Sequence, residues 1–168
     1  MARSARELLA SMNDIVWAIN PSHDHLSDLR QRMRRFASDL FGPREIDFVF
    51  RAPAADQDLK LGADVRREIY LIFKEAVNNV VRHADCTNVE IDFSRERDAL
   101  MLRISDNGKG LPVKVSGTGH GLTSMQARAK ALGGETTITS VASGGTVIAL
   151  RVPLGRPGPF SRGYYSNE

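Results

Sequence analysis

A cluster of glycines between Asp106 and Leu122 is the first feature of this sequence that could carry chemistry. Five of the chain's 14 glycines lie in this segment, DNGKGLPVKVSGTGHGL. Glycine adopts positive backbone angles and lets main-chain N–H groups come close to an anion. The segment contains neither Gly-x4-Gly-Lys-Ser/Thr nor Gly-x-Gly-x-x-Gly, the two common phosphate-binding patterns. On this segment alone, a flexible surface loop and a phosphate-binding loop are both open interpretations.

Two neighbouring features favour the phosphate-binding interpretation. The segment ends in Gly-x-Gly-x-Gly directly before a helical pattern, and the free amides and dipole of a helix N-terminus favour phosphate oxygens. The segment begins just after a strand pattern in which Asp106 lies two residues beyond Ile104, so that its carboxylate points to the buried face. A buried carboxylate requires a partner. The exocyclic amine of adenine can donate the proton that such a carboxylate accepts.

A long helical pattern from about residue 64 to residue 84 supplies the other polar candidates. Its apolar stripe predicts that one face packs on a core, and the stripe consists of Val65, Ile69, Ile72, Phe73, Ala76, Val80 and Ala84. Glu75, Asn79 and His83 lie four residues apart. An α-helix therefore places these three side chains on one line along its surface.

The remaining periodicities predict the elements that position these residues. Two apolar-striped helical segments, 4–20 and 26–42, follow one another and are separated by Asn20-Pro21, where a proline breaks the helix. A strand is expected at 46–50, and an antiparallel hairpin at 88–94 and 100–106 with a turn at 95–98. A short helix at 122–132, a weak strand at 136–140 and a last strand at 146–152 complete the pattern, and a flexible tail follows.

Composition limits the class of protein. The chain has 168 residues with 42% hydrophobic and 26% charged residues, which is typical of a globular domain, and it has no apolar run of about 20 residues. We therefore expect it to lie in the cytoplasm. Cys86 is the only cysteine, so no internal disulfide can form. The densest arginine cluster, residues 30–35, falls on the polar face of a helical pattern, so it indicates a solvated face and no nucleic-acid partner.

Taken together, four motifs resemble the N, G1, G2 and G3 elements of the GHKL ATPases, in the family's order and spacing. They are Glu75-Ala-Val-Asn-Asn79-Val-Val-Arg-His83-Ala, Asp106-Asn-Gly108-Lys-Gly110, Gly117-Thr-Gly119-His120-Gly121-Leu122 and Gly144-Gly145-Thr146. The likeness is greatest to the catalytic domain of sensor histidine kinases that signal to helix-turn-helix response regulators. It implies an α+β fold, a two-layer α/β sandwich of the Bergerat type. In that fold the helices cover one face of a mixed, mostly antiparallel sheet, here preceded by N-terminal helices.

The resemblance also implies roles for individual residues. Asp106 would bind the adenine amino group, with Thr146 supporting that contact through water. Asn79 would bind Mg²⁺ through its amide oxygen, and Glu75 would act as a general base or position the reacting groups. The other residues expected to contact ATP are Gly108, Gly110, Gly117, Gly119, Gly121 and Leu122. His83 and His120 are expected to contact phosphates, although solvent exposure of both is an open alternative.

The family's phosphoacceptor is a histidine on the first of two dimerisation helices, and residues before Met12 do not supply that helix. The segment from Met12 to Pro21 resembles the second dimerisation helix, while His23-Asp24 follows the helix break and is not expected to be the acceptor. We therefore expect a fragment of a larger kinase, and membrane anchoring of that kinase is left open. Its partners would be ATP, the acceptor helix, a response regulator and a second copy of the protein bound through the N-terminal helices.

The expected domain boundaries are 1–43 for the partial dimerisation helix and connecting helical segment, 44–154 for the catalytic domain and 155–168 for the tail. Two other functions fit the same motifs. A stand-alone GHKL protein could hydrolyse ATP or phosphorylate serine, as anti-sigma-factor kinases do, but it would not need a truncated dimerisation helix. A non-catalytic nucleotide-binding module would not need Glu75, Asn79, Asp106 and Gly119 to be intact.

Overall fold

The structure is a computed structural model that describes residues 12, 16–17, 20–52, 59–110, 120–141 and 144–155. Five strands form one sheet in the order β1-β2-β3-β5-β4. Their bounds are β1 Asp47–Arg51, β2 Asn88–Glu96, β3 Ala99–Asp106, β4 Glu135–Ser140 and β5 Thr146–Pro153. The pair β1–β2 is parallel and the other three pairs are antiparallel, which confirms the predicted mixed sheet.

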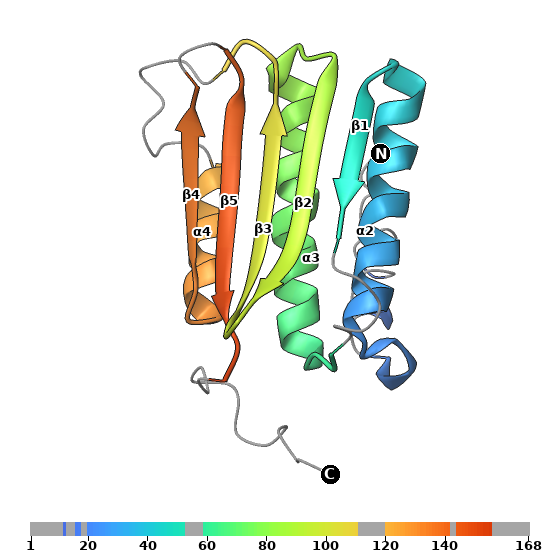
Figure 1. The fold of residues 1–168 in the computed structure, drawn as a ribbon, viewed down its shortest axis with the longest axis vertical. Helices are drawn as coiled ribbons and strands as arrows, with labels where there is room; N and C mark the ends of the chain where they lie inside the picture. Colours follow the sequence, from blue (N-terminus) through green and yellow to red (C-terminus); the bar gives the residue numbers. More distant parts are fainter. Residues whose placement is uncertain are drawn as a thin grey trace.

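Three helices lie on one face of the sheet, as Figure 1 shows. They are α2 Leu26–Phe41, α3 Ala63–Asn79 and α4 His120–Ala131. The 3₁₀ turns Pro21–His23 and Gly42–Arg44 flank α2, and a π-helical turn, Val80–Ala84, continues α3. None of the helices among the described residues is long and apolar enough to cross a membrane.

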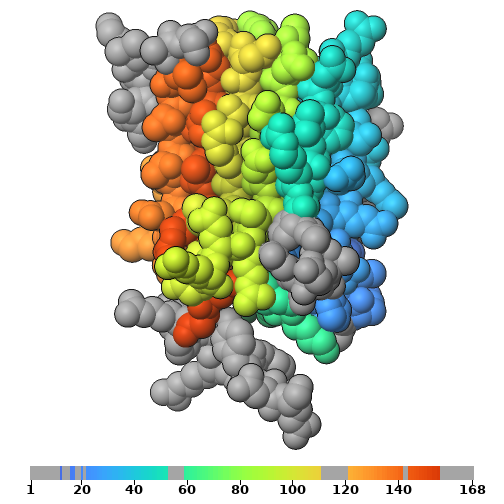
Figure 2. Space-filling view, in the orientation of Figure 1, coloured from blue at the N-terminus to red at the C-terminus, as the bar shows by residue number. Residues whose placement is uncertain are grey.

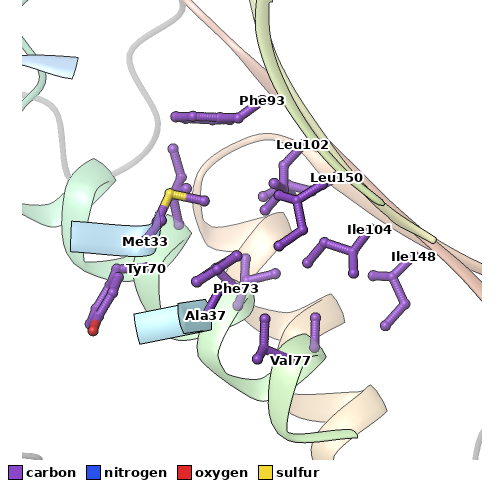
Figure 3. Packing of buried hydrophobic residues seen from close by; sticks show 14 of the residues in the cluster. Met33, Ala37, Tyr70, Phe73, Val77, Phe93, Leu102, Ile104, Ile148 and Leu150 are labelled. Carbon is purple, nitrogen blue, oxygen red and sulfur yellow. The ribbon is translucent and has the colours of Figure 1, made fainter. Parts of the chain in front are cut away.

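The core lies between the helices and the sheet because each strand alternates buried and exposed side chains. Figure 3 shows Phe93, Leu102 and Leu150 from the sheet facing Met33 of α2 and Phe73 of α3. None of the helices among the described residues lies on the opposite face of the sheet, and Figure 2 shows the side chains of β1, β2, β3 and β5 next to one another on it. Arg51 on that face pairs with Glu90 and Asp92 at 3.0 and 3.2 Å.

The helix predicted at 26–42 is confirmed, but its buried stripe differs from the expected one. An apolar spacing of 3, 4, 3 and 4 residues in the sequence predicts a stripe of Leu26, Leu29, Met33, Phe36 and Leu40, whereas the fully buried positions are Leu26, Leu29, Met33, Ala37 and Phe41. Phe36 and Leu40 are half-buried. A spacing of four residues after Met33 turns the stripe slowly around the helix, which keeps it on the twisted sheet and on α3.

Two boundaries were wrong in detail. The hairpin turn expected at residues 95–98 contains only Arg97 and Asp98, because β2 continues to Glu96 and Arg97 adopts a left-handed conformation (φ 47°). The predicted helix at 64–84 is α-helical only to Asn79. At Val80 the backbone N–H is shared by the carbonyls of Ala76 and Val77, and the wider π turn begins there.

Candidate nucleotide-binding site

Asp106 is the last residue of β3 and is 7% exposed, as strand parity predicted. Its Oδ1 accepts a hydrogen bond of 2.9 Å from the backbone N–H of Gly108. The carboxylate therefore lies at the end of the sheet, below the loop that it helps to shape. Thr146, the first residue of β5, is also buried at 9% exposure. Because β3 and β5 are paired neighbours, both polar side chains belong to the same end of the sheet.

The glycines after Asp106 are required by close backbone packing. A Cβ at Gly108 would overlap the carbonyl of Ala84, whose oxygen also accepts a 2.8 Å hydrogen bond from the backbone N–H of Lys109. Gly110 has φ +73° and approaches the carbonyl of Gly145. Gly145 has φ +94°, and a Cβ there would overlap the carbonyl of Asp106. The glycine loops after β3 and before β5 thus pack on each other around the buried carboxylate.

Asn107 holds this loop to the start of β2, a role that the sequence analysis missed. Its Oδ1 accepts hydrogen bonds from the backbone N–H groups of Thr87 and Asn88 at 3.0 and 2.9 Å. Its Nδ2 donates to Thr87 Oγ1 at 2.9 Å. The signal in the sequence was an asparagine directly after the last strand residue, where an Asx side chain commonly binds turn backbone.

Lys109 pairs with Asp85 across the same loop, with Nζ and Oδ2 2.7 Å apart. The hydrogen bond from Lys109, followed by its positive charge, holds the pKa of Asp85 below its ordinary value. Asp85 adopts a left-handed conformation (φ 49°) at the end of the π turn. In this arrangement Lys109 ties the loop to the end of the long helix.

Cys86 lies beside the buried carboxylate. The pKa of its thiol is raised by burial first and by the negative charge of Asp106 second. The half-buried side chain packs against the hydrophobic core, as a small hydrophobic residue near a helix end does.

Glu75 of α3 lies against the N-terminus of α4. A Cβ at Gly121 would overlap the carboxylate oxygen Oε1 of Glu75, so a larger residue there would require the Glu75 side chain to move. Glu68, seven residues or about two turns earlier on α3, pairs with Arg128 of α4 at 2.6 Å and fixes the two helices together. The structure therefore brings the predicted acidic residue to the helix end that was predicted to bind phosphates.

Asn79 is half-buried at the last residue of α3, one turn after Glu75, so these two residues keep the predicted alignment. His83 does not continue that line. It lies in the π turn, where more residues per turn rotate it away from the α-helical position, and its side chain is exposed.

The predicted phosphate-binding glycines are described only in part. Gly117 and Gly119 lie outside the described residues, as does the side chain of His120. The backbone of His120 begins α4, and Gly121 and the half-buried Leu122 follow in its first turn. The structure thus describes the side chains of Lys109 and His83 and not that of His120.

The structure is an α+β domain with a buried carboxylate, that of Asp106, at the end of the sheet where two glycine-containing loops meet. Residues 64–156 match the family described as histidine kinase-, DNA gyrase B-, and HSP90-like ATPases. This match spans more than half of the chain, and the chain belongs to that family. Use of a nucleotide follows from the family.

Relatives in the family are sensor kinases. The chain is 36% identical over 101 residues to the sensor protein VraS of Staphylococcus haemolyticus (strain JCSC1435), covering 60% of the chain and 29% of VraS. It is 34% identical over 99 residues to the sensor histidine kinase LiaS of Bacillus subtilis (strain 168), covering 58% of the chain and 28% of LiaS. The chain thus carries a catalytic domain of the sensor histidine kinase type and spans less than a third of these relatives.

Solved structures show the same fold. The histidine kinase domain of the blue-light activated kinase from Erythrobacter litoralis EL346 aligns with TM-score 0.62 and 20% identity, over 75% of this chain and 61% of that chain. The nucleotide-free catalytic domain of histidine kinase ThkA aligns with TM-score 0.62 and 16% identity, over 77% of this chain and 93% of that chain. The predicted fold class is confirmed.

Proposed function

We propose that this chain binds Mg-ATP and transfers the γ-phosphoryl group to a histidine on a dimerisation helix outside the chain, for relay to a response regulator. The observation that carries the proposal is the buried carboxylate of Asp106, which accepts a hydrogen bond from the backbone of Gly108 while Gly145 packs against the backbone carbonyl of Asp106. A buried carboxylate in a space shaped by glycine backbones suits the exocyclic amine of adenine.

In this proposal Asp106 accepts a hydrogen bond from the adenine amino group, and the buried Thr146 supports the same contact from β5. The bond from Gly108 to Asp106 fixes the carboxylate before the base arrives, so that less ordering is needed on binding. Gly108 and Gly110 form the floor of the adenine pocket. Asn107 keeps the loop in register with β2.

The phosphates extend toward the N-terminus of α4, where the amides of Gly117, Gly119, Gly121 and Leu122 bind their oxygens. His83 and His120 are proposed to contact the phosphates from either side. Asn79 presents an amide oxygen at the end of α3, the kind of hard oxygen donor that suits Mg²⁺. When bound, Mg²⁺ neutralises charge on the β- and γ-phosphates.

Glu75 lies where it can position the reacting groups. Its carboxylate is packed against Gly121, so it is fixed beside the first turn of the phosphate-binding helix. As a general base, it accepts the proton that the acceptor imidazole loses when its unprotonated nitrogen attacks the γ-phosphoryl group. The protein contributes mainly orientation and electrostatics to such a transfer.

The partners follow from the same proposal. A second copy binds through the N-terminal helices, the acceptor helix and a response regulator complete the relay, and the catalytic domain works in the cytoplasm. The division into 1–43, 44–154 and 155–168 stays a prediction.

Binding of a fluorescent ATP analogue tests the adenine pocket. Asp106→Ala and the isosteric Asp106→Asn are each expected to weaken Mg²⁺-dependent binding at least tenfold, since a charged acceptor is lost. Asp98→Ala, in the exposed hairpin turn, serves as the matched control and should bind as the unmodified chain does. Unchanged binding in both Asp106 variants would show that the pocket lies elsewhere.

A second experiment tests the acceptor. The chain is incubated with radiolabelled ATP and a peptide that supplies the upstream dimerisation helix with its histidine. Label that is lost in acid and kept in alkali is the expected result, because phosphohistidine has that stability. Label on serine would favour the anti-sigma type of kinase, and release of phosphate without label would favour an ATPase.

A further inference from the structure

Two polar contacts join α3 and α4, and they are spaced alike on both helices. The Glu75 side chain fills the space beside Gly121 that a Cβ would occupy. Oε2 of Glu68 accepts a hydrogen bond of 2.6 Å from Nη1 of Arg128. Seven residues separate the two contacts on α3, and seven separate them on α4. Figure 1 shows the two helices running in opposite directions on one face of the sheet, so the contacts lie about 10 Å apart along the same helix pair.

The Glu68 carboxylate is oriented for its contact with α4. Glu68 is 9% exposed, and its Oε1 accepts hydrogen bonds from Nε and Nη2 of Arg67 at 3.0 and 2.8 Å. Arg67 lies on α3 itself, with its Nη2 3.8 Å from Oδ1 of Asp64. Because Arg67 occupies Oε1, the second oxygen is directed to Arg128, whose side chain is half-buried. A buried carboxylate needs such partners, and the two guanidinium groups hold it in one orientation.

Apolar packing fixes the axial position of α4 less closely than this pair does. Among the described side chains of α4, only Met125 and Ala129 are fully buried. The free energy of burying apolar surface is non-directional, so a small shift of α4 along its axis would keep most of it. A hydrogen bond between charged groups weakens steeply with distance and angle. The pair of Glu68 with Arg128 therefore selects one position of α4 along α3.

The position of α4 matters most at its N-terminus, two turns before Arg128. An α-helix rises 1.5 Å per residue and transmits a shift at one turn to the next turns as a rigid element. In the proposed function the first turn of α4 binds phosphates, and Glu75 beside it acts on the reacting groups. A misplacement of about 1 Å between reacting groups can slow a transfer about 100-fold.

We infer that Glu68 and Arg128 are positioning residues, whose ion pair places the phosphate-binding end of α4 beside Glu75. The inference rests on the proposed function for what α4 binds. The proposed adenine contacts come from Asp106 of β3 and Thr146 of β5, which are not on either helix. Loss of the ion pair should therefore weaken binding of the phosphates and leave binding of the base unchanged.

Titrations with two ligands test this division, followed by the amide resonances of the isotope-labelled chain. Arg128→Gln and the isosteric Glu68→Gln should weaken binding of a non-hydrolysable Mg-ATP analogue about fivefold or more. Their affinity for adenosine, which carries no phosphate, should stay within twofold of the unmodified chain. Arg67→Gln is the matched control, because it removes a cation from the same carboxylate without releasing α4, and it should change neither affinity by more than twofold.

Two outcomes of the titrations would overturn the inference. Equal losses for adenosine and the ATP analogue would show that the pair supports the fold in general, and unchanged affinity for the analogue in both variants would show that the pair positions nothing. Intact adenosine binding also shows that a variant is folded. Should Arg128→Gln fail to fold, Glu68→Gln decides by the same criteria.

The position of α4 is also measured without a nucleotide. In Arg128→Gln the amide resonances of Gly121 and Leu122 should shift by at least twice as much as in Arg67→Gln, because the first turn of α4 leaves its place beside Glu75. Resonances that stay in place would overturn the inference. Failure of the unmodified chain to bind the ATP analogue would instead contradict the proposed function, and the ligand-free comparison would still decide whether the pair positions α4.

Discussion

Asp106 shows how a single residue acquires its role from its neighbours. Strand alternation alone directs its carboxylate into the protein, and the packing of Gly145 against its carbonyl prevents the strand end from turning outward. Asn107, the next residue, points to the other side and binds the backbone at the start of β2. Asp106 thus faces the proposed adenine site, while Asn107 fixes the loop.

The Asp85–Lys109 ion pair predicts a pH dependence at the residue scale. The pKa of Asp85 is lower in the folded state, so the pair stabilises the fold above the unfolded pKa of about 4, and this contribution is lost as pH falls through the folded pKa. Lys109→Met should therefore lower the urea midpoint slightly at pH 7 and not at all below about pH 3.

The matched control for this pair is Lys130→Met, since Lys130 is exposed on α4 and lies in no ion pair among the described residues. The urea midpoint of Lys130→Met should stay close to that of the unmodified chain at both pH values. Added salt at 0.5 M should also reduce the effect of Lys109→Met, because exposed charges are screened. A difference that grows at low pH would show that Lys109 acts through another partner.

At the scale of elements, the loops before and after the strands hold the site together. Gly145 lies at the start of β5, with φ +94° and its Cα against the carbonyl of Asp106. Gly145→Ala should therefore cost about 2–4 kcal/mol of unfolding free energy, from backbone strain and displacement of β3, and should weaken nucleotide binding as well.

Gly42→Ala is the matched control for this substitution. Gly42 has φ −53° at the end of α2, and an added Cβ would meet no atom within 4 Å. Its unfolding free energy, measured in urea, should stay within about 0.5 kcal/mol of the unmodified chain or rise slightly. Equal costs at Gly42 and Gly145 would contradict the close packing of the two glycine loops.

Most elements could be predicted from the sequence because their apolar periodicities are clear. The strand parity that buried Asp106 is a local signal that the structure confirms, and the glycine pair Gly133-Gly134 that ends α4 is another local signal. The π turn at Val80–Ala84 could not be predicted, since its apolar residues fit an α-helical stripe equally well. It changes the surroundings of His83, and it presents the Ala84 carbonyl to the loop at Lys109.

The contacts that the sequence did not predict join residues far apart in the chain. Periodicity places Glu68 on a helix, but only the packing of α3 on α4 brings Arg128 to its carboxylate. Periodicity likewise gives no reason for Arg32 to meet both Trp17 and Tyr70. Such pairs depend on which helices become neighbours, and no local spacing encodes that.

The whole molecule has one core, and α2 is part of it. Leu29 and Met33 are fully buried in the same cluster as Phe73 of α3 and Ile91 of β2, and Figure 3 shows Met33 and Ala37 of α2 among the side chains of α3 and the sheet. A helix that contributes to the shared core should unfold with the sheet in one cooperative transition.

Leu29→Ala tests this cooperativity. Because Leu29 is fully buried, its truncation leaves a cavity and should lower the free energy of unfolding of the whole domain by about 2–5 kcal/mol. Far-ultraviolet circular dichroism, which follows all helices, and near-ultraviolet signals from the aromatic core should give the same urea midpoint. Gln31→Ala, on an exposed position of α2, should change the free energy by less than about 0.5 kcal/mol. A separate early loss of helix signal in Leu29→Ala, with the core signals unchanged, would show that α2 is an independent connecting segment.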